Sequence, residues 1–309
     1  MINRNKVKTY SVKFRYSKVK NTDFAKPPKP GRSFSTFYAS LPNILKAKDL
    51  RILVDAIVKA HKRNKPVIFM CGAHVIKCGL NPIVIELIKK KVISCLCLNG
   101  AGIIHDFEIA YQARTSEDVA RNLKSGKFGM GREPADFLNL AIEEGVSEGW
   151  GLGSSVARKI AKSKLRFKNL SIIYNADKNK IPVCVFVAVG TDIIHQHPSF
   201  NAALTGEGSL RDFHLLRDCV AGLNNGGVVL NFGSAVILPE VFLKALNLSR
   251  NLGNQVKNFT TANFDMIHHY RPSQNVVARP VMQGGKGFYM IGHHEIMLPV
   301  LAQAVVDKL

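Results

Sequence analysis

Six short apolar runs, separated by stretches with helical periodicity, constrain the fold of this chain more than any other feature. The runs cover residues 67–71, 94–98, 183–189, 228–231, 258–262 and 288–291. Apolar residues at helical spacing lie at 47–62, 79–90, 116–124, 134–145, 154–163, 169–179, 209–223, 238–251 and 295–307. Continuous apolar strands that alternate with helices are typical of a parallel sheet buried on both faces. We therefore predict an α/β fold, a Rossmann-like parallel sheet with helices on both faces.

The N-terminal part of the chain has a different composition. Residues 1–49 contain twelve Lys or Arg against Asp23 and Asp49, and the Pro-rich stretch 26–31 interrupts any regular element. The amphipathic pattern begins only at residue 47. With 309 residues, the chain is long enough for one large domain and a short appendage. We predict a basic N-terminal arm at residues 1–46 and a nucleotide-binding domain at 47–309.

Charge and cysteine usage narrow the range of partners. Nearly half of the net charge of +21 lies in the arm, and no RNA-binding motif accompanies it, so we do not expect a nucleic-acid partner. No apolar run of eighteen residues and no secretory signal occur, so we expect no membrane span. The six cysteines lie mostly in apolar runs and form no zinc-binding set, which favours reduced thiols, a cytoplasmic location and no metal.

Small and polar residues follow each apolar run. The segments are 71–74, 99–108, 190–197, 231–234, 260–271 and 292–295. In an open parallel sheet, ligands bind beyond the carboxyl ends of the strands, where small residues allow backbone amides to approach a phosphate or ribose. Six strands that all deliver Gly, Thr, Asn, Asp or His to one edge predict a nucleotide-type site there.

Histidines and carboxylates in these segments are the candidates for chemistry. The histidines are His105, His195, His197, His268, His269, His293 and His294. Histidine titrates near neutral pH and suits acid–base catalysis, although it also binds metals, so a metal hydrolase remains an alternative. Asp192 and Asp265 follow small or hydroxyl residues at strand ends and suit ribose hydroxyls; helix or turn capping is the alternative role. The glycine-rich 284–287 precedes a strand, so it is not a phosphate loop.

The order of several motifs resembles the deoxyhypusine synthase family over residues 65–305. The matching stretches are 99–102 followed by 105–107, 171–182, Thr191-Asp192, 226–233, and Thr261-Ala262 with Asp265. The resemblance implies a protein that uses NAD and a lysine to move an aminobutyl group from spermidine to a protein lysine. It also implies a homotetramer with sites at subunit interfaces and an N-terminal arm that reaches a neighbouring subunit.

The catalytic lysine of that family has no counterpart at the matching position. The stretch 274–280 ends in Arg279-Pro280, and Lys286 lies six residues further on. Proline forms no imine, and arginine stays protonated and is a poor nucleophile. His105 and His197 also stand where the family has carboxylates that grip a polyamine. We therefore expect a neutral or anionic small substrate in place of spermidine.

Together these patterns predict an NAD-dependent enzyme whose reaction stays open. The expected cofactor-binding residues are Gly100, Ala101, Gly102, Thr191, Asp192, Gly233, Ser234, Thr261, Ala262 and Asp265. The expected catalytic candidates are His105, His197, His269 and His293, and Arg271 would anchor an anionic substrate. A genuine aminobutyl transferase that uses Lys286, and a non-catalytic nucleotide-binding or metal-dependent protein, are the alternatives.

Overall fold

The computed structural model describes residues 3–309, so residues 1 and 2 of the predicted arm lie outside the described part. The chain divides into two compact units, Met1–Arg51 and Ile52–Leu309, and the division falls inside helix α2 (Leu45–Lys62). In the first unit, short 3-10 turns precede helix α1 (Phe34–Ser40). The Arg51 guanidinium donates hydrogen bonds to the carbonyls of Tyr38, Leu41 and Pro42, which ties the helical part of this unit together.

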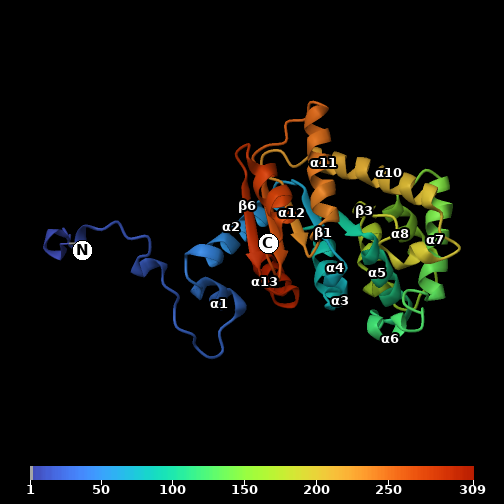
Figure 1. Cartoon of the computed structure of the whole chain (residues 1–309), viewed down its shortest axis with the longest axis horizontal. Coiled ribbons are helices and arrows are strands. Elements are labelled where there is room, and N and C mark those ends of the chain that lie inside the picture. Colours follow the sequence, from blue (N-terminus) through green and yellow to red (C-terminus); the bar gives the residue numbers. More distant parts are fainter. Residues whose placement is uncertain (1–2) are drawn as a thin grey trace. The chain divides into compact units, whose positions relative to one another are not determined.

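The second unit is built on a parallel sheet of six strands in the order β3-β2-β1-β4-β5-β6 (Figure 1). The strands are β1 (Val67–Cys71), β2 (Cys95–Asn99), β3 (Val183–Phe186), β4 (Val228–Phe232), β5 (Thr260–Asp265) and β6 (Lys286–Ile291). All six lie within or beside the apolar runs of the sequence. The order reverses between β1 and β4, which is the arrangement of a doubly wound nucleotide-binding sheet. The predicted fold class is confirmed.

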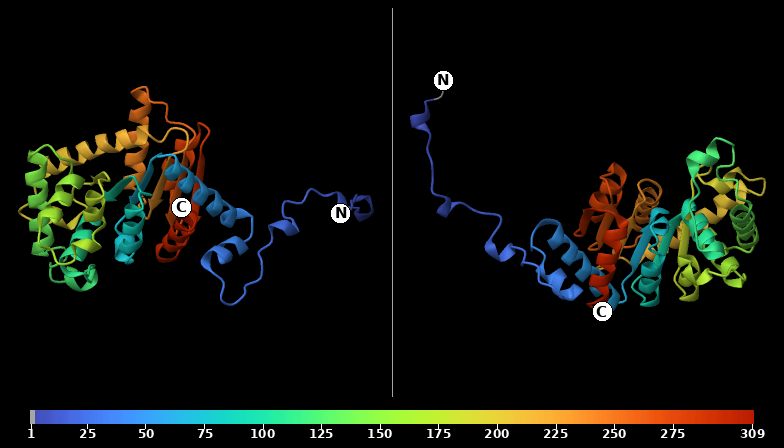
Figure 2. Two further views of the ribbon diagram at one scale, coloured as in Figure 1. Left: turned by 180° about the vertical axis from the view of Figure 1, so that it is seen from behind. Right: turned by 90° about the horizontal axis from the view of Figure 1, so that it is seen from below.

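Helices cover both faces of this sheet (Figure 2). The helices of this unit after α2 are α3 (His74–Lys77), α4 (Asn81–Lys89), α5 (Gly100–Gln112), α6 (Val119–Leu123), α7 (Arg132–Ser147), α8 (Leu152–Lys162), α9 (Ile172–Lys178), α10 (Ala202–Ala221), α11 (Ile237–Asn251), α12 (Tyr270–Pro272) and α13 (His294–Val306). Leu216 of α10 and Phe242 of α11 pack with Ile68 and Met70 in one core. On the opposite face, Phe232 stacks on Phe264 and contacts His294 of α13.

Helix α5 was not predicted from the sequence. Its first residues, Gly100, Ala101 and Gly102, have the composition of a turn, and glycine lowers helix propensity. The helix nevertheless begins directly after β2, because the Asn99 side chain accepts a hydrogen bond from the Gly102 amide and caps it. Because His105 lies on α5, the helix and not a loop orients its side chain.

Helix α10 also differs from its prediction, because it begins at Ala202 and not at residue 209. Asn201 caps it by accepting a hydrogen bond from the Leu204 amide. Among the described residues, no helix is long and apolar enough to cross a membrane.

Candidate functional site

The carboxyl edge of the sheet contains a cavity of about 240 Å³ between α5 and the loop that follows β3. Its lining includes Ala101, His105 and Glu108 from α5, Thr191, Asp192 and Ile193 from the loop, and Lys77 from α3. Ser116, Glu117, Val119 and Phe128, from residues 113–131, complete the wall. The structure therefore brings four of the predicted site residues together: Ala101, His105, Thr191 and Asp192.

The cavity face of α5 follows from helical spacing. Ala101, Ile104, His105 and Glu108 stand at i, i+3, i+4 and i+7, so their side chains share one face of the helix. Glu108 lies in one of the predicted polar segments, but it was not among the expected site residues, because α5 was not predicted as a helix. The spacing itself was present in the sequence.

His105 belongs to a short hydrogen-bonded chain of side chains. Its Nδ1 lies 2.5 Å from Thr115 Oγ1 and 3.4 Å from Glu108 Oε2, and the Thr115 hydroxyl donates to the same Glu108 oxygen. The single hydroxyl proton is used in that bond, so Thr115 accepts from His105, and the imidazole proton must be on Nδ1. In the neutral ring, Nε2 then keeps its lone pair and can accept a proton.

Glu108 is ionised in this arrangement. Burial raises the pKa of its carboxyl, but the hydrogen bonds from His105 and Thr115 together hold that pKa below its usual value. A carboxylate beside Nδ1 fixes the orientation of the ring, as in other carboxylate–histidine pairs. These contacts hold the His105 ring in place at the wall of the cavity.

Asp192 lies at the opposite wall, next to the start of α5. A Cβ on Gly100 would overlap its carboxylate, so the absence of a side chain at Gly100 allows this close approach. The Ala101 amide donates a hydrogen bond to Asp192, while Oδ2 is buried with no hydrogen-bond partner among the described residues. Burial raises the pKa of Asp192 to about 6, and the Ala101 hydrogen bond only partly opposes this. The side chain thus has an unsatisfied acceptor.

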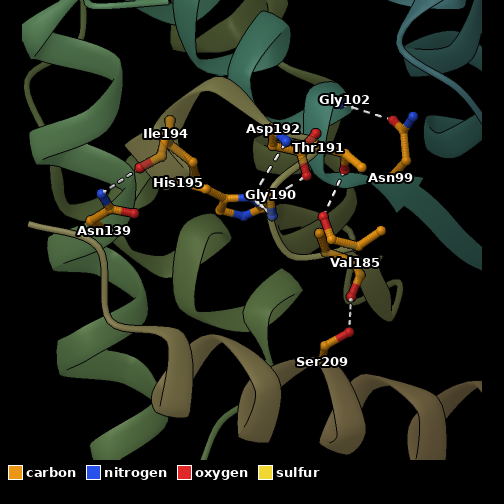
Figure 3. A network of polar contacts seen from close by, with 11 residues as sticks. Asn99, Gly102, Asn139, Val185, Gly190, Thr191, Asp192, Ile194, His195 and Ser209 are labelled. Carbon is orange, nitrogen blue, oxygen red and sulfur yellow. Dashed lines mark hydrogen bonds and ion pairs between the residues drawn. The ribbon is translucent and has the colours of Figure 1, made fainter. Parts of the chain in front are cut away.

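His195 shapes the loop that presents Asp192 (Figure 3). It was not among the expected catalytic residues. Its Nδ1 accepts hydrogen bonds from the Gly190 amide at 3.1 Å and the Asp192 amide at 3.3 Å. Two donors on Nδ1 require a ring that carries its proton on Nε2, which lies 4.0 Å from Asp192 Oδ2. Burial lowers the pKa of His195, in agreement with a neutral ring. His195 is a loop-shaping residue.

The other predicted residues of this edge lie away from the cavity. His197 Nε2 contacts the Gly129 carbonyl at 2.9 Å and so connects the loop after β3 to residues 113–131. Gly102 is buried in the first turn of α5. Asp106, the neighbour of His105, accepts hydrogen bonds from Ser171, the amides of Ile172 and Ile173, and Asn81, and thereby caps α9.

A second group of polar residues follows β4, β5 and β6. Asp265 ends β5, and its Oδ2 lies 3.7 Å from His269 Nε2. The backbone of Gly233 has a φ of +64°, and His294 packs against it with a buried Nδ1 that lacks a partner among the described residues. The His294 ring lies 5.8 Å from that of His74, the first residue of α3. This group flanks the point at which the strand order reverses.

Several candidates near this group have other contacts. Arg271 lies 3.4 Å from Glu240, and His293 is largely exposed, 3.9 Å from Glu295. Ser234 Oγ accepts from the Leu238 amide at the start of α11. Thr261 and Ala262 are fully buried within β5, three or more residues before its carboxyl end.

Lys286 lies at the opposite edge of the sheet. It is the first residue of β6 and pairs with Thr260, the first residue of β5. There it lines a hollow of about 410 Å³ with Asn225 and Asn258. A parallel strand separates its two ends by its full length, so Lys286 and the cavity beside His105 face different edges.

The comparisons with known proteins show the fold. No protein-family model matches the sequence, and no curated protein matches it. A proposed LOR/SDH protein from Methanococcus maripaludis S2 is 14% identical, with a TM-score of 0.51 over 95% of this chain and 74% of its own. A proposed deoxyhypusine synthase from Entamoeba histolytica is 10% identical, with a TM-score of 0.52 over 90% of this chain and 94% of its own.

AgrE is a third structural neighbour. A mutant of AgrE in complex with L-arginine is 14% identical, with a TM-score of 0.53 over 85% of this chain. AgrE has also been solved with ornithine and NAD⁺, at 14% identity and a TM-score of 0.50 over 87% of this chain. The present chain spans about a third of the length of AgrE, 34% in both comparisons. The relation to the deoxyhypusine synthase and LOR/SDH proteins is therefore one of shared fold.

Proposed function

We propose that this chain is an NAD-dependent enzyme that oxidises a small amino acid or related amine at the carbon that bears the nitrogen. The observation that carries the proposal is the His105–Thr115–Glu108 chain, which faces Asp192 across one cavity at the carboxyl edge of the sheet. A general base and a carboxylate with an unsatisfied oxygen share this cavity in a doubly wound fold. The proposal therefore depends on the base, on the carboxylate that would bind a ribose hydroxyl, and on the position of both at the carboxyl edge of the sheet.

The residues at this edge fit part of a dinucleotide. Asp192, which lines the cavity, and Asp265, at the end of β5, are suited to ribose hydroxyls. A cavity of about 240 Å³ is below the roughly 300–1,000 Å³ of usual ligand sites, so it would hold only one portion of the cofactor or the substrate. When bound, NAD supplies a hydride acceptor.

His105 would act on the amine of the substrate. Its Nε2 takes one proton from the ammonium group, which frees the nitrogen lone pair. As the hydride leaves the adjacent carbon, that lone pair forms the C=N bond of the iminium product. Glu108 stabilises the imidazolium that results, because its carboxylate lies 3.4 Å from Nδ1. The proton stays on His105 until solvent removes it.

The charges in the lining favour a substrate that carries both signs. Glu108, Glu117 and Asp192 contribute carboxylates, and Lys77 is the one Lys or Arg among the described lining residues. An amino acid would place its ammonium near the carboxylates and its carboxylate at Lys77 Nζ. This zwitterion is neutral overall, in line with the expected substrate charge. AgrE has been solved with L-arginine and with ornithine and NAD⁺, so it binds amino acids, although both of these carry a net positive charge.

The aminobutyl transferase alternative is less well supported. It needs a lysine beside the bound cofactor, and Lys286 lies at the amino edge of the sheet. A tetrameric assembly with sites at subunit interfaces stays a prediction from the resemblance. Light scattering at micromolar concentration tests it, and a 34 kDa monomer would contradict it.

Calorimetry with NAD, followed by turnover assays with a panel of amino acids and amines, tests the proposal. We expect NAD to bind, and Asp192→Asn to weaken binding by about 1.5–3 kcal/mol, the scale of a charge-assisted hydrogen bond. Asp177→Asn, a change in α9 away from the cavity, is the matched control and should bind as the parent protein does. His105→Gln should bind NAD normally and lose turnover. Absence of NAD binding at millimolar concentration would refute the proposal.

A further inference from the structure

We propose that Thr115 is a positioning residue and that it couples closure of residues 113–131 over the cavity to the protonation geometry of His105. This inference rests on the proposed role of His105 as a base. Residues 113–131 connect α5 to α7 and supply one wall of the cavity. When the segment is closed, the Thr115 hydroxyl holds the imidazole proton on Nδ1; when it opens, His105 loses this partner.

The contacts of Thr115 carry the first step. Its hydroxyl is the only group that touches both His105 Nδ1 and Glu108 Oε2 among the described residues, and Nδ1 is closer to Thr115, at 2.5 Å, than to Glu108, at 3.4 Å. Without this hydroxyl, the Nδ1–H would have only the longer contact to Glu108. The neutral ring could then move its proton to Nε2, where it can no longer act as a base.

The segment that carries Thr115 is held by few contacts. Within residues 113–131, Gly129 is the one buried residue that the structure describes. Its amide donates to Glu117 Oε1 at 2.8 Å, and its carbonyl accepts from His197 Nε2 at 2.9 Å. Few buried contacts are characteristic of regions that open locally, and the hydrogen bonds among residues 117–125 are exposed and stay within the segment. The segment is therefore held at two points. Thr115 binds it to α5, and Gly129 binds it to the loop after β3.

The backbone around these two points is suited to a hinge. Ala113 and Ser116, on either side of Thr115, have φ angles of +57° and +69°, and Gly129 has a φ of +74°. A Cβ on Gly129 would lie 2.7 Å from Cβ of Ile193, against the loop that presents Asp192. Gly129→Ala should therefore release the far end of the segment without changing Thr115.

Two measurements on the full chain, neither of which needs NAD or substrate, test the coupling. The first is ¹⁵N NMR of the His105 ring, assigned by comparison with His105→Gln. We expect the Nδ1–H form to dominate in the parent protein and in Thr115→Ser. In Thr115→Val, which keeps the shape and lacks the hydroxyl, the ratio of the Nδ1–H to the Nε2–H form should fall by about fivefold, as expected for the loss of one hydrogen bond.

The second measurement is limited trypsin cleavage at Arg114, Arg121, Lys124 and Lys127. Gly129→Ala should increase the cleavage rate by about tenfold and shift the His105 proton in the same direction as Thr115→Val does. Ser125→Ala, whose hydroxyl contacts only the nearby Asn122 carbonyl, is the control and should change neither measurement.

The outcomes separate the two proposals. An unchanged His105 tautomer in Thr115→Val, with circular dichroism that shows a folded protein, would overturn the positioning role. Faster cleavage in Gly129→Ala without a tautomer change would overturn the coupling. A tautomer shift in a protein that binds no NAD would retain this inference and reject the proposed function alone.

Discussion

Gly100→Ala tests the contact between the start of α5 and Asp192 directly. The new Cβ would overlap Asp192 Oδ2, lie 2.6 Å from its Cγ and stand 3.1 Å from Val187 Cγ1. Both the carboxylate and its hydrogen bond from the Ala101 amide must therefore shift. Overpacking of this kind costs about 1–3 kcal/mol, and the weakened hydrogen bond adds about 1 kcal/mol. A helical Gly→Ala change alone stabilises by about 0.5–1 kcal/mol, so we expect a net loss of about 1–3.5 kcal/mol.

The same substitution should be almost neutral once the carboxylate is removed. In an Asp192→Ala background, only the tighter Val187 contact remains, and the helix propensity gain offsets it, so Gly100→Ala should change the free energy of unfolding by less than about 0.5 kcal/mol. Urea unfolding of the parent, both single variants and the double variant gives the coupling energy. An equal loss in both backgrounds would show that Gly100 and Asp192 do not meet, and the geometry of the cavity wall would be wrong.

Three further predictions follow from the site. Because burial raises the pKa of Asp192 to about 6, NAD affinity should fall about tenfold as the pH drops from 7 to 5 and this carboxylate gains a proton; calorimetry should show a flat profile for Asp192→Asn. Asp106→Asn leaves two donors of the α9 cap unsatisfied, so urea unfolding should show a loss of about 2–4 kcal/mol, with His105 NMR signals unchanged. Lys286→Ala should leave NAD binding unaltered, and the parent protein should transfer no label from spermidine; transfer that depends on Lys286 would restore the alternative function.

The order of apolar strands and helices was sufficient to predict the α/β class and the edge at which polar residues gather. These features follow from local chemistry, because each buried strand must be continuous and apolar, and ligands are reached only where strands end. Asp192 could be chosen for that reason alone, whereas Ala101 and Thr191 were also chosen from the resemblance to the deoxyhypusine synthase family. Helix α5 was not predicted because the low helix propensity of Gly100 and Gly102 outweighs the Asn99 cap when only the local sequence is considered.

Only the tertiary structure shows which candidate residues lie at the cavity and which make other contacts. His105 and His197 both follow strand ends, but helix α5 turns His105 toward the cavity, whereas the loop after β3 places His197 against the Gly129 carbonyl. Thr115 is separated from His105 by ten residues, and only the turn after α5 returns its hydroxyl to the ring. Lys286 is close in sequence to the expected lysine position, yet the direction of β6 places it at the amino edge. Strand composition determines which residues are buried, whereas chain reversal between elements determines which of the remaining polar groups meet.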